Sequence, residues 1–351
     1  MAYTTINKST DYFNTVLYTG NTTDDRTISG VGFQPDWNWT KNRSATQHHW
    51  VADAVRGSSK MLMPDLTNAE YNAPSQGSIA SFNADGYVLQ AGSSADENYN
   101  YENNNYVSWN WKANGAGSAN TDGTISSTVS ANTTAGFSIV SYTGNLTDGA
   151  TVGHGLGVAP DMMIIKNRSD TQYWVVYHKD LGGANNHLRL DGTAAKRNDL
   201  NMFSSTAPTS SVFEIGTQPQ VNGNTNNIIS YCFAEKKGYS KFGSYTGNGS
   251  ADGIFVYTGF KPAFVLIKRS DGTPNWTIND TARDPTNVNN LRLFPNQNVV
   301  ESSGSDSMDM LSNGFKLRST DGGNNFSGGT FIYMAFGQSL VGSNNVPCTA
   351  R

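Results

Sequence analysis

The sequence predicts an all-β protein made of three tandem, related domains of the β-sandwich or jelly-roll type. The first observation is the unit Tyr-Thr-Gly-Asn, which occurs at residues 18–21, 142–145 and 245–248. The second is that a Pro, a Lys, a Trp and a closing strand follow each copy in the same order and at nearly the same spacing. The third is the abundance of Gly, Asn, Ser and Thr between short apolar runs, which is typical of strands joined by turns. Landmarks repeated in a fixed order indicate triplication.

The landmarks divide the chain into an N-terminal arm (1–11), β repeat 1 (12–112), a Gly/Ser/Thr-rich linker (113–135), β repeat 2 (136–234), β repeat 3 (235–337) and a C-terminal tail (338–351). Repeats of this size fit the usual size of a domain, and each can enclose a modest core of its own. The linker has almost no large side chains. We therefore expect an exposed crossing that leaves repeat 1 more independent than repeats 2 and 3. The polar arm and tail are expected to be loose unless a partner orders them.

Composition argues against several classes of function. Charged residues make up only 15% of the chain and the formal net charge is −4, so we expect no basic surface for nucleic acid. No apolar run approaches the length of a membrane span, so no membrane insertion is expected. The first residues lack the basic end and apolar core of an export signal, and two cysteines do not make a disulfide framework. These features predict synthesis in a reducing cytoplasm.

The strand that follows each repeated Pro differs between the copies on one of its faces. That face carries Asn38 and Thr40 in repeat 1, Met163 and Ile165 in repeat 2, and Val265 and Ile267 in repeat 3. Buried polar groups are unfavourable unless they are paired. We therefore predict that this face is open to water in repeat 1 and covered by a neighbour in repeats 2 and 3. The alternative is that Asn38 and Asn110, on the closing strand, hydrogen-bond each other.

No arrangement of residues marks a metal or cofactor site, and none is predicted. The five histidines do not recur between repeats, and His48 and His49 are adjacent, which directs them to opposite faces of a strand. Asp24, Asp148 and Asp252 each follow a Tyr-Thr-Gly-Asn unit and carry the oxygen ligands that calcium prefers. The simpler interpretation is that Asp is a favoured turn residue.

No residue has the setting of a catalytic group, so no catalytic residue is predicted. The sequence contains no Gly-x-Ser-x-Gly elbow and no phosphate-binding Gly loop. No Asp or Glu lies in a setting that marks it as catalytic, although a carboxylate pair for glycoside hydrolysis can also be formed by residues that only the fold brings together. Cationic side chains do recur at one position: Lys41, Lys166 and Lys268 stand at the ends of the Pro-led strands. We expect their aliphatic stems to lie over apolar surface with the charged heads in water, rather than to form an anion site.

One segment has the composition of a recognition surface. Residues 99–106 combine Tyr with Asn, which supplies rigid aromatic area and adaptable hydrogen bonding. The loop is also slightly longer in repeat 1 than its counterpart in repeat 3. Tyr99, Tyr101, Asn103 and Asn104 are therefore the candidate residues for contact with a partner or a glycan. The alternative is an ordinary polar loop.

Several motifs resemble an uncharacterised repeat family of tailed-bacteriophage virion proteins. They are Ser-Tyr-Thr-Gly-Asn at 141–145, Gly-Leu-Gly-Val-Ala-Pro-Asp at 155–161, Lys-Asn-Arg-Ser at 166–169 and the run at 238–249. The resemblance extends over residues 12–337. It implies a location in the virion and no established catalytic residues.

With the resemblance, the sequence predicts a non-enzymatic structural protein on the exterior of a phage virion: a capsid decoration protein, a head fibre or a tail appendage. The expected partners are other virion proteins, in a symmetric homo-oligomer with a trimer favoured. One alternative is a receptor- or glycan-binding module of a tail fibre that uses exposed aromatic residues on a host surface glycan. A further alternative is a polysaccharide depolymerase with a carboxylate pair.

Overall fold

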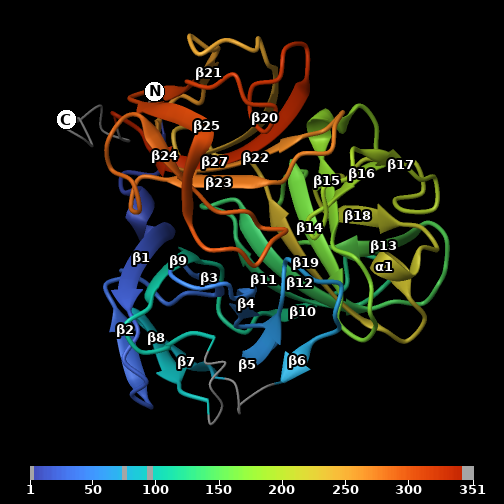
Figure 1. Cartoon of the computed structure of the whole chain (residues 1–351). Coiled ribbons are helices and arrows are strands. Elements are labelled where there is room, and N and C mark those ends of the chain that lie inside the picture. The colour runs from blue at the N-terminus through green and yellow to red at the C-terminus, as the bar shows by residue number, and fades with distance from the viewer. Residues whose placement is uncertain (1–3, 73–76, 93–97, 342–351) are drawn as a thin grey trace.

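The chain folds almost entirely into antiparallel strands, which confirms the prediction of an all-β protein. The computed structural model describes residues 4–72, 77–92 and 98–341. Three lobes follow the order of the chain and appear in blue, in green and yellow, and in orange and red (Figure 1). In each lobe two sheets pack against each other, so the protein is a multi-sandwich. We call the sheet that contains the closing strand of a repeat its large sheet; it has more strands than the second sheet in repeats 1 and 2 and the same number in repeat 3. No helix in the described ranges has the length and apolar character needed to cross a membrane.

The N-terminal arm contains a 3-10 turn, η1 (Ser9–Asp11). Repeat 1 places six strands in the order β1-β9-β3-β4-β5-β6 against three in the order β2-β8-β7. The strands are β1 (Phe13–Thr19), β2 (Arg26–Ser29), β3 (Trp37–Asn42), β4 (His49–Asp53), β5 (Gly57–Leu62), β6 (Tyr71–Asn72), β7 (Ser78–Asn83), β8 (Gly86–Gln90) and β9 (Asn105–Trp111).

Repeat 2 has eight strands in the order β10-β11-β12-β19-β14-β15-β16-β17 and a small sheet of β13 and β18, with two short helical turns. The elements are β10 (Ser118–Asn120), β11 (Ser127–Asn132), β12 (Phe137–Thr143), β13 (Ala150–Gly153), β14 (Met162–Asn167), β15 (Val175–His178), η3 (Lys179–Leu181), β16 (Asn186–Arg189), β17 (Arg197–Asn198), β18 (Val212–Ile215), α1 (Pro219–Asn222) and β19 (Asn227–Phe233).

Repeat 3 has two four-stranded sheets, in the orders β20-β27-β22-β23 and β21-β26-β25-β24. The strands are β20 (Ser240–Thr246), β21 (Phe255–Tyr257), β22 (Lys261–Arg269), β23 (Thr277–Asp280), β24 (Asn289–Arg292), β25 (Ser302–Leu311), β26 (Gly314–Leu317) and β27 (Thr330–Gln338). The large sheets of the three repeats share one strand order, since β1-β9-β3-β4 corresponds to β12-β19-β14-β15 and to β20-β27-β22-β23.

The large sheets turn one face towards a core that all three repeats share. On the closing strands this face carries Trp109 and Trp111, then Tyr231 and Phe233, then Met334 and Phe336, all buried. Rings from different repeats lie in contact, as Trp37 and Tyr231 do with their centroids 4.6 Å apart. So much aromatic surface is strongly favoured out of water. The expectation that repeat 1 is more independent was therefore wrong.

The predicted linker is part of the fold. Residues 118–132 contribute β10 and β11, and β11 pairs along its whole length with β12 of repeat 2. Val129 and Ile125 are buried in the interior of the repeat 2 sandwich. An exposed crossing was expected because the segment has few large residues, but a strand that covers a sheet edge needs only backbone groups and a few apolar side chains.

The described parts of the arm and the tail are also packed. Ile6 lies in the shared core, and the Ser9 backbone N–H donates to the Gln338 side chain over 2.6 Å. The Gln338 amide in turn donates to the Asn7 carbonyl. The expected loose lead-in is therefore corrected for residues 4–11, because one apolar side chain fixes the segment and the two chain ends bind each other. Residues 1–3 and 342–351 lie outside the described ranges.

The polar face of repeat 1 is buried, contrary to the prediction. Asn38 and Thr40 have no exposed surface. Asn38 donates to the Asn110 side-chain oxygen over 2.8 Å, and the Thr40 hydroxyl donates to the Asn38 oxygen over 2.8 Å. The interpretation in which Asn38 and Asn110 hydrogen-bond each other is correct. The corresponding apolar residues of repeats 2 and 3 are buried as expected, but by the second sheet of their own repeat.

Candidate binding site

The repeated Tyr-Thr-Gly-Asn unit fastens each sandwich to the turn that precedes its closing strand. The tyrosine hydroxyls of Tyr18, Tyr142 and Tyr245 donate to backbone carbonyls in this turn over 2.7–2.8 Å. The glycine lies so close to the turn that a Cβ on Gly144 would be 2.4 Å from the Gly223 carbonyl oxygen. The asparagine N–H donates to a second Asn, as Asn145 does to Asn222. The repeated motif is therefore structural.

The contact between the repeated unit and this turn determines where the predicted contact loop lies. Tyr99 belongs to the turn that Tyr18 holds, and it is fully buried in the interior of repeat 1. The assignment of Tyr99 to a contact surface is corrected, because its ring fills the core. Asn104 is half-buried and its carbonyl accepts the Gly20 N–H. Tyr101 is 42% exposed and Asn103 is exposed, so two of the four predicted residues face solvent.

The recurring lysines do not have solvated heads. Lys41, Lys166 and Lys268 are fully buried. The ammonium of Lys166 donates to the carbonyls of Thr67, Asn167 and Gln172 over 2.7–3.1 Å. Burial lowers the pKa of each lysine to about 8. Because Thr67 belongs to repeat 1, Lys166 fastens two repeats together; sequence could not show this, since the carbonyls come from distant loops.

The turn aspartates each have a separate local partner. Asp24 accepts the Ala91 N–H, Asp148 accepts the Ser204 hydroxyl over 2.6 Å, and Asp252 pairs with Lys316 over 2.6 Å. Within the described ranges, no group of three or more His, Cys, Asp or Glu side chains is placed to hold a metal ion. The contacts fit the interpretation of Asp as a turn residue.

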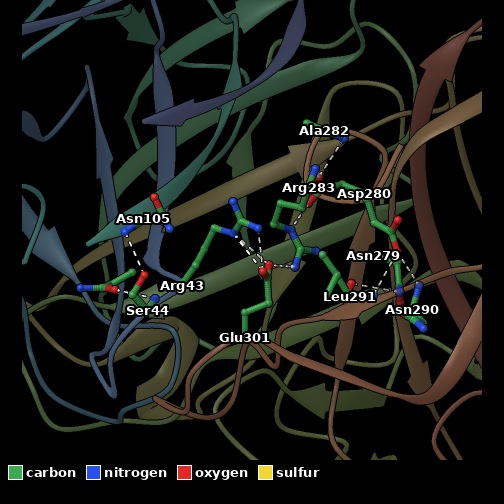
Figure 2. Close-up of polar contacts among 12 residues, drawn as sticks. Arg43, Ser44, Asn105, Asn279, Asp280, Ala282, Arg283, Asn290, Leu291 and Glu301 are labelled. Atoms are coloured by element: carbon green, nitrogen blue, oxygen red, sulfur yellow. Dashed lines mark hydrogen bonds and ion pairs between the residues drawn. The ribbon is translucent and has the colours of Figure 1, made fainter. Parts of the chain in front are cut away.

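Buried ionic contacts join repeat 1 to both of its neighbours. Figure 2 shows the contact with repeat 3, where Glu301 accepts hydrogen bonds from Arg43 of repeat 1 and Arg283 of repeat 3 over 2.7–3.1 Å. Arg283 also pairs with Asp280, and both side chains are fully buried. Burial alone would raise the pKa of Glu301, but the two arginines outweigh it and hold the pKa low.

The contact between repeats 1 and 2 copies this arrangement. Glu70 pairs with Arg56 of its own repeat and with Arg168 of repeat 2 over 2.8–3.1 Å. Arg56 pairs with Asp53, which accepts the Tyr231 hydroxyl of repeat 2 over 2.7 Å. Ion pairs in which every charge is paired resist separation, because removing one partner leaves a buried charge.

The contact between repeats 2 and 3 keeps the backbone geometry of the other two contacts, but among the described residues it has no counterpart of the buried Arg–Asp pairs. The N–H of Lys196 donates to the Ser270 carbonyl over 2.7 Å, as the N–H groups of Glu70 and Glu301 do to Arg168 and Arg43. His178 takes the place of Asp53 and Asp280 at the strand end, and burial lowers its pKa to about 4, so it stays neutral. Three equivalent interfaces therefore form a ring around the shared core.

The main candidate for a ligand site is a pocket of about 390 Å³ on repeat 1, which we name the His48 pocket. It is lined by Thr46, Gln47, His48, Trp50, Met63, Leu66, Asn68, Tyr71 and Asn98. Its volume is within the range of small-molecule sites, and its aromatic and amide side chains are the groups that hold polar rings.

Two buried donors that border the His48 pocket have no hydrogen-bond partner among the described residues. The Trp50 indole N–H and the Asn98 amide nitrogen have no hydrogen bond to the described residues, and both side chains are 3% exposed. Tyr71 is 39% exposed at the rim. Buried donors in proteins are usually paired, so their presence beside a pocket favours a ligand with acceptor oxygens.

His48 and Asp65 form the charged element of the pocket. His48 Nδ1 lies 2.6 Å from Asp65 Oδ2, and Asp65 also accepts the His49 N–H. The bond to Asp65 raises the pKa of His48 and outweighs the opposite effect of burial. Glycoside hydrolysis uses two carboxylates across the substrate, whereas the described lining contributes none and Asp65 lies behind the imidazole.

Sequence reasoning did not identify the His48 pocket. His48 and Trp50 lie on one side of β4 and its approach, while Tyr71 and Asn98 come from segments far along the chain. The adjacent histidines do point to opposite sides: His49 accepts the Trp39 indole N–H inside the shared core. The alternation of side chains along a strand is the signal that could have placed His48 and Trp50 on one face and His49 on the other.

No curated protein matches the chain. The model of one protein family, described as Domain of unknown function (DUF7483), matches residues 8–339, which includes all three repeats and the linker. The match spans nearly the whole sequence, and the chain therefore belongs to this family of unknown function.

Proposed function

We propose that the protein is a non-enzymatic structural component on the exterior of a phage virion: a capsid decoration protein, a head fibre or a tail appendage. The observation that carries the proposal is the fusion of three sandwiches into one body by a shared aromatic core and buried ionic contacts. The ion pairs Arg43–Glu301 and Arg168–Glu70 and the buried lysines Lys166 and Lys268 join one repeat to another. The resemblance of the repeats to phage virion proteins points the same way.

The proposal includes other virion proteins as partners and a symmetric homo-oligomer, with a trimer favoured. A single body whose three repeats share one core is suited to repeated placement on a particle surface. The net charge of −4 and the scarcity of charged residues give no reason to expect nucleic acid as partner.

The test is to purify particles from a lysate that expresses this sequence and to analyse them by mass spectrometry after a density gradient. We expect the protein to be found in the particle fraction at a fixed ratio to the capsid protein, and antibody to label the particle exterior in electron micrographs. A protein found only in the soluble fraction would contradict the proposal.

A second candidate function is binding of a host surface glycan, for which the His48 pocket is the specific observation. A sugar ring offers hydroxyl oxygens to the Trp50 and Asn98 donors and a face for the Tyr71 ring. A glycan array tests it with wild-type protein, with Tyr71→Ala and with Tyr101→Ala, which alters the exposed loop predicted to contact a glycan. Binding lost in Tyr71→Ala and kept in Tyr101→Ala supports the pocket, and the reverse result supports the loop. Turnover of any polysaccharide would contradict the non-enzymatic proposal.

A further inference from the structure

Each sandwich has one side where the first strands of its two sheets lie next to each other, and we call it the open side. The three repeats differ in what covers this side. In repeat 2 it is filled by residues 118–132. There β11 pairs with edge strand β12, and Ile125 forms a parallel bridge to Val152 of β13, donating its N–H to the Thr151 carbonyl over 3.0 Å. One segment therefore covers the edges of both sheets.

In repeat 1 the same side is closed by a side chain. Asn14 of β1 donates to the carbonyls of Gly30 and Val31, which follow β2 in the other sheet, over 3.0–3.3 Å. The polar bridge joins the two edges directly.

In the described part of the chain, repeat 3 has neither a covering segment nor a side-chain bridge of this kind. Among the described residues, β20 and β21 are the outer strands of their sheets, each paired on one side only. Between them lies a pocket of about 440 Å³, whose lining includes the charged side chains of Lys179, Asp180, Glu235 and Lys241. Phe255 and Tyr257 also line it, and they are 44% and 55% exposed. They flank Val256, the counterpart of Val152, so apolar surface is exposed where Ile125 lies in repeat 2.

The β20 edge also presents backbone groups outward. At the two ends of the β20–β27 ladder, Gly337 N–H donates to the Tyr239 carbonyl and Gly247 N–H donates to the Gly329 carbonyl. Hydrogen-bonded pairs alternate along an antiparallel ladder. Odd-numbered residues of β20 therefore bond to β27, and the N–H of Ser244 points to the free edge. Ser141, the counterpart of Ser244 on β12, pairs with Thr128 of β11.

We propose that the open side of repeat 3 is a strand-accepting site for an extended segment of another protein. The segment pairs with β20 as β11 pairs with β12, and it places a large apolar side chain between Phe255 and Tyr257. The internal precedent specifies its chemistry: an uncharged strand of alternating small polar and β-branched residues, as in Ser-Thr-Val-Ser-Ala-Asn at 127–132, with an apolar anchor before it. Main-chain hydrogen bonds then supply affinity and the anchor supplies specificity.

The test uses the full-length protein and, as probe, a fluorescent synthetic peptide with the sequence of residues 118–132. We expect saturable binding in a 1:1 ratio by fluorescence anisotropy. Ser244→Pro removes only the outward N–H, which is the place where proline is tolerated on an edge strand, and we expect it to weaken binding at least tenfold. Ser244→Thr retains the N–H and is the matched control.

Phe255→Ser provides a second variant that does not disturb the backbone, and it too is expected to weaken binding at least tenfold. Melting curves of all variants establish that they are folded. Absence of binding to the wild-type protein, or equal binding by Ser244→Pro and Phe255→Ser, would overturn the proposal. So would concentration-dependent dimerisation of the protein alone that Ser244→Pro abolishes, because the occupant would then be a second copy of the same edge. The particle-location experiment is independent of all these results.

Discussion

Trp109 of repeat 1 donates its indole N–H to the carboxylate of Asp280 in repeat 3, across 3.0 Å and with both side chains buried. Tyr231 of repeat 2 makes the counterpart of this contact to Asp53 of repeat 1 over 2.7 Å. In both contacts a donor on the closing strand of one repeat forms a hydrogen bond to a carboxylate at the end of a strand in a neighbouring repeat. The contacts explain why polar groups can lie at the border of an aromatic core without loss of stability.

Removal of the Asp280 carboxylate should destabilise the whole protein. Asp280→Ala leaves Arg283 fully buried with Glu301 as its remaining charged partner, and removal of one member of a buried ion pair typically lowers the free energy of unfolding by about 3–5 kcal/mol. Glu102→Ala, at an exposed position, should change it by no more than about 0.5 kcal/mol. Denaturant titrations of both variants make the comparison, and equal small losses would show that the ion pair is solvated.

The buried polar face of repeat 1 predicts a loss of stability for a single change and a recovery for a combined change. Asn110→Ala leaves the Asn38 amide without its partner and should lower stability by about 1–3 kcal/mol. Asn38→Val and Thr40→Ile combined with Asn110→Ala copy the residues of repeat 3 and should recover much of the loss, because both partners of the Asn38–Asn110 and Thr40–Asn38 hydrogen bonds are then replaced by apolar groups. Thermal melts make the comparison, and a triple variant less stable than the sum of the single changes would contradict the pairing.

The three buried lysines should make stability rise with pH above neutrality. Burial lowers the pKa of Lys41, Lys166 and Lys268 to about 8, whereas the unfolded chain keeps them protonated to about pH 10.4. Between these values the unfolded state binds more protons, so stability increases with pH. Below pH 8 both states are protonated and the effect disappears.

The measurement is the midpoint of urea unfolding at pH 7.5 and 9.5, below the ordinary pKa of tyrosine at about 10. Lys166→Met should reduce the rise relative to the wild-type protein, and Lys60→Met, at a half-exposed lysine on β5, should leave it unchanged. A wild-type midpoint that falls over this range would mean that the lysines are hydrated.

The glycine of the repeated unit should tolerate no side chain. In Gly144→Ala the new Cβ would lie 2.4 Å from the Gly223 carbonyl oxygen, which is backbone and cannot rotate away. We expect a loss of about 1–3 kcal/mol, the usual range for overpacking. Gly192→Ala is the control, since its nearest contact would be at 3.9 Å. Calorimetry of the two variants makes the comparison. An unchanged stability in Gly144→Ala would contradict a structural role of the motif.

Local patterns were sufficient to predict the all-β class, because alternation and turn residues are properties of neighbouring positions. The burial of Asn38 was not predictable in this way, since its partner Asn110 is brought opposite only by the register of β3 against β9. Tyr99 was assigned to the surface because its neighbours are polar, yet the Tyr18 contact draws it inward. The His48 pocket likewise depends on segments that only the tertiary fold brings together.

The central claim is that the three repeats form one cooperative unit around a shared core. Differential scanning calorimetry of the full chain tests it most directly. We predict a single transition whose calorimetric and van't Hoff enthalpies agree, and a shift of this whole transition to lower temperature in Asp280→Ala. Separate transitions, with only one of them shifted by Asp280→Ala, would show that the repeats unfold independently and would contradict the account.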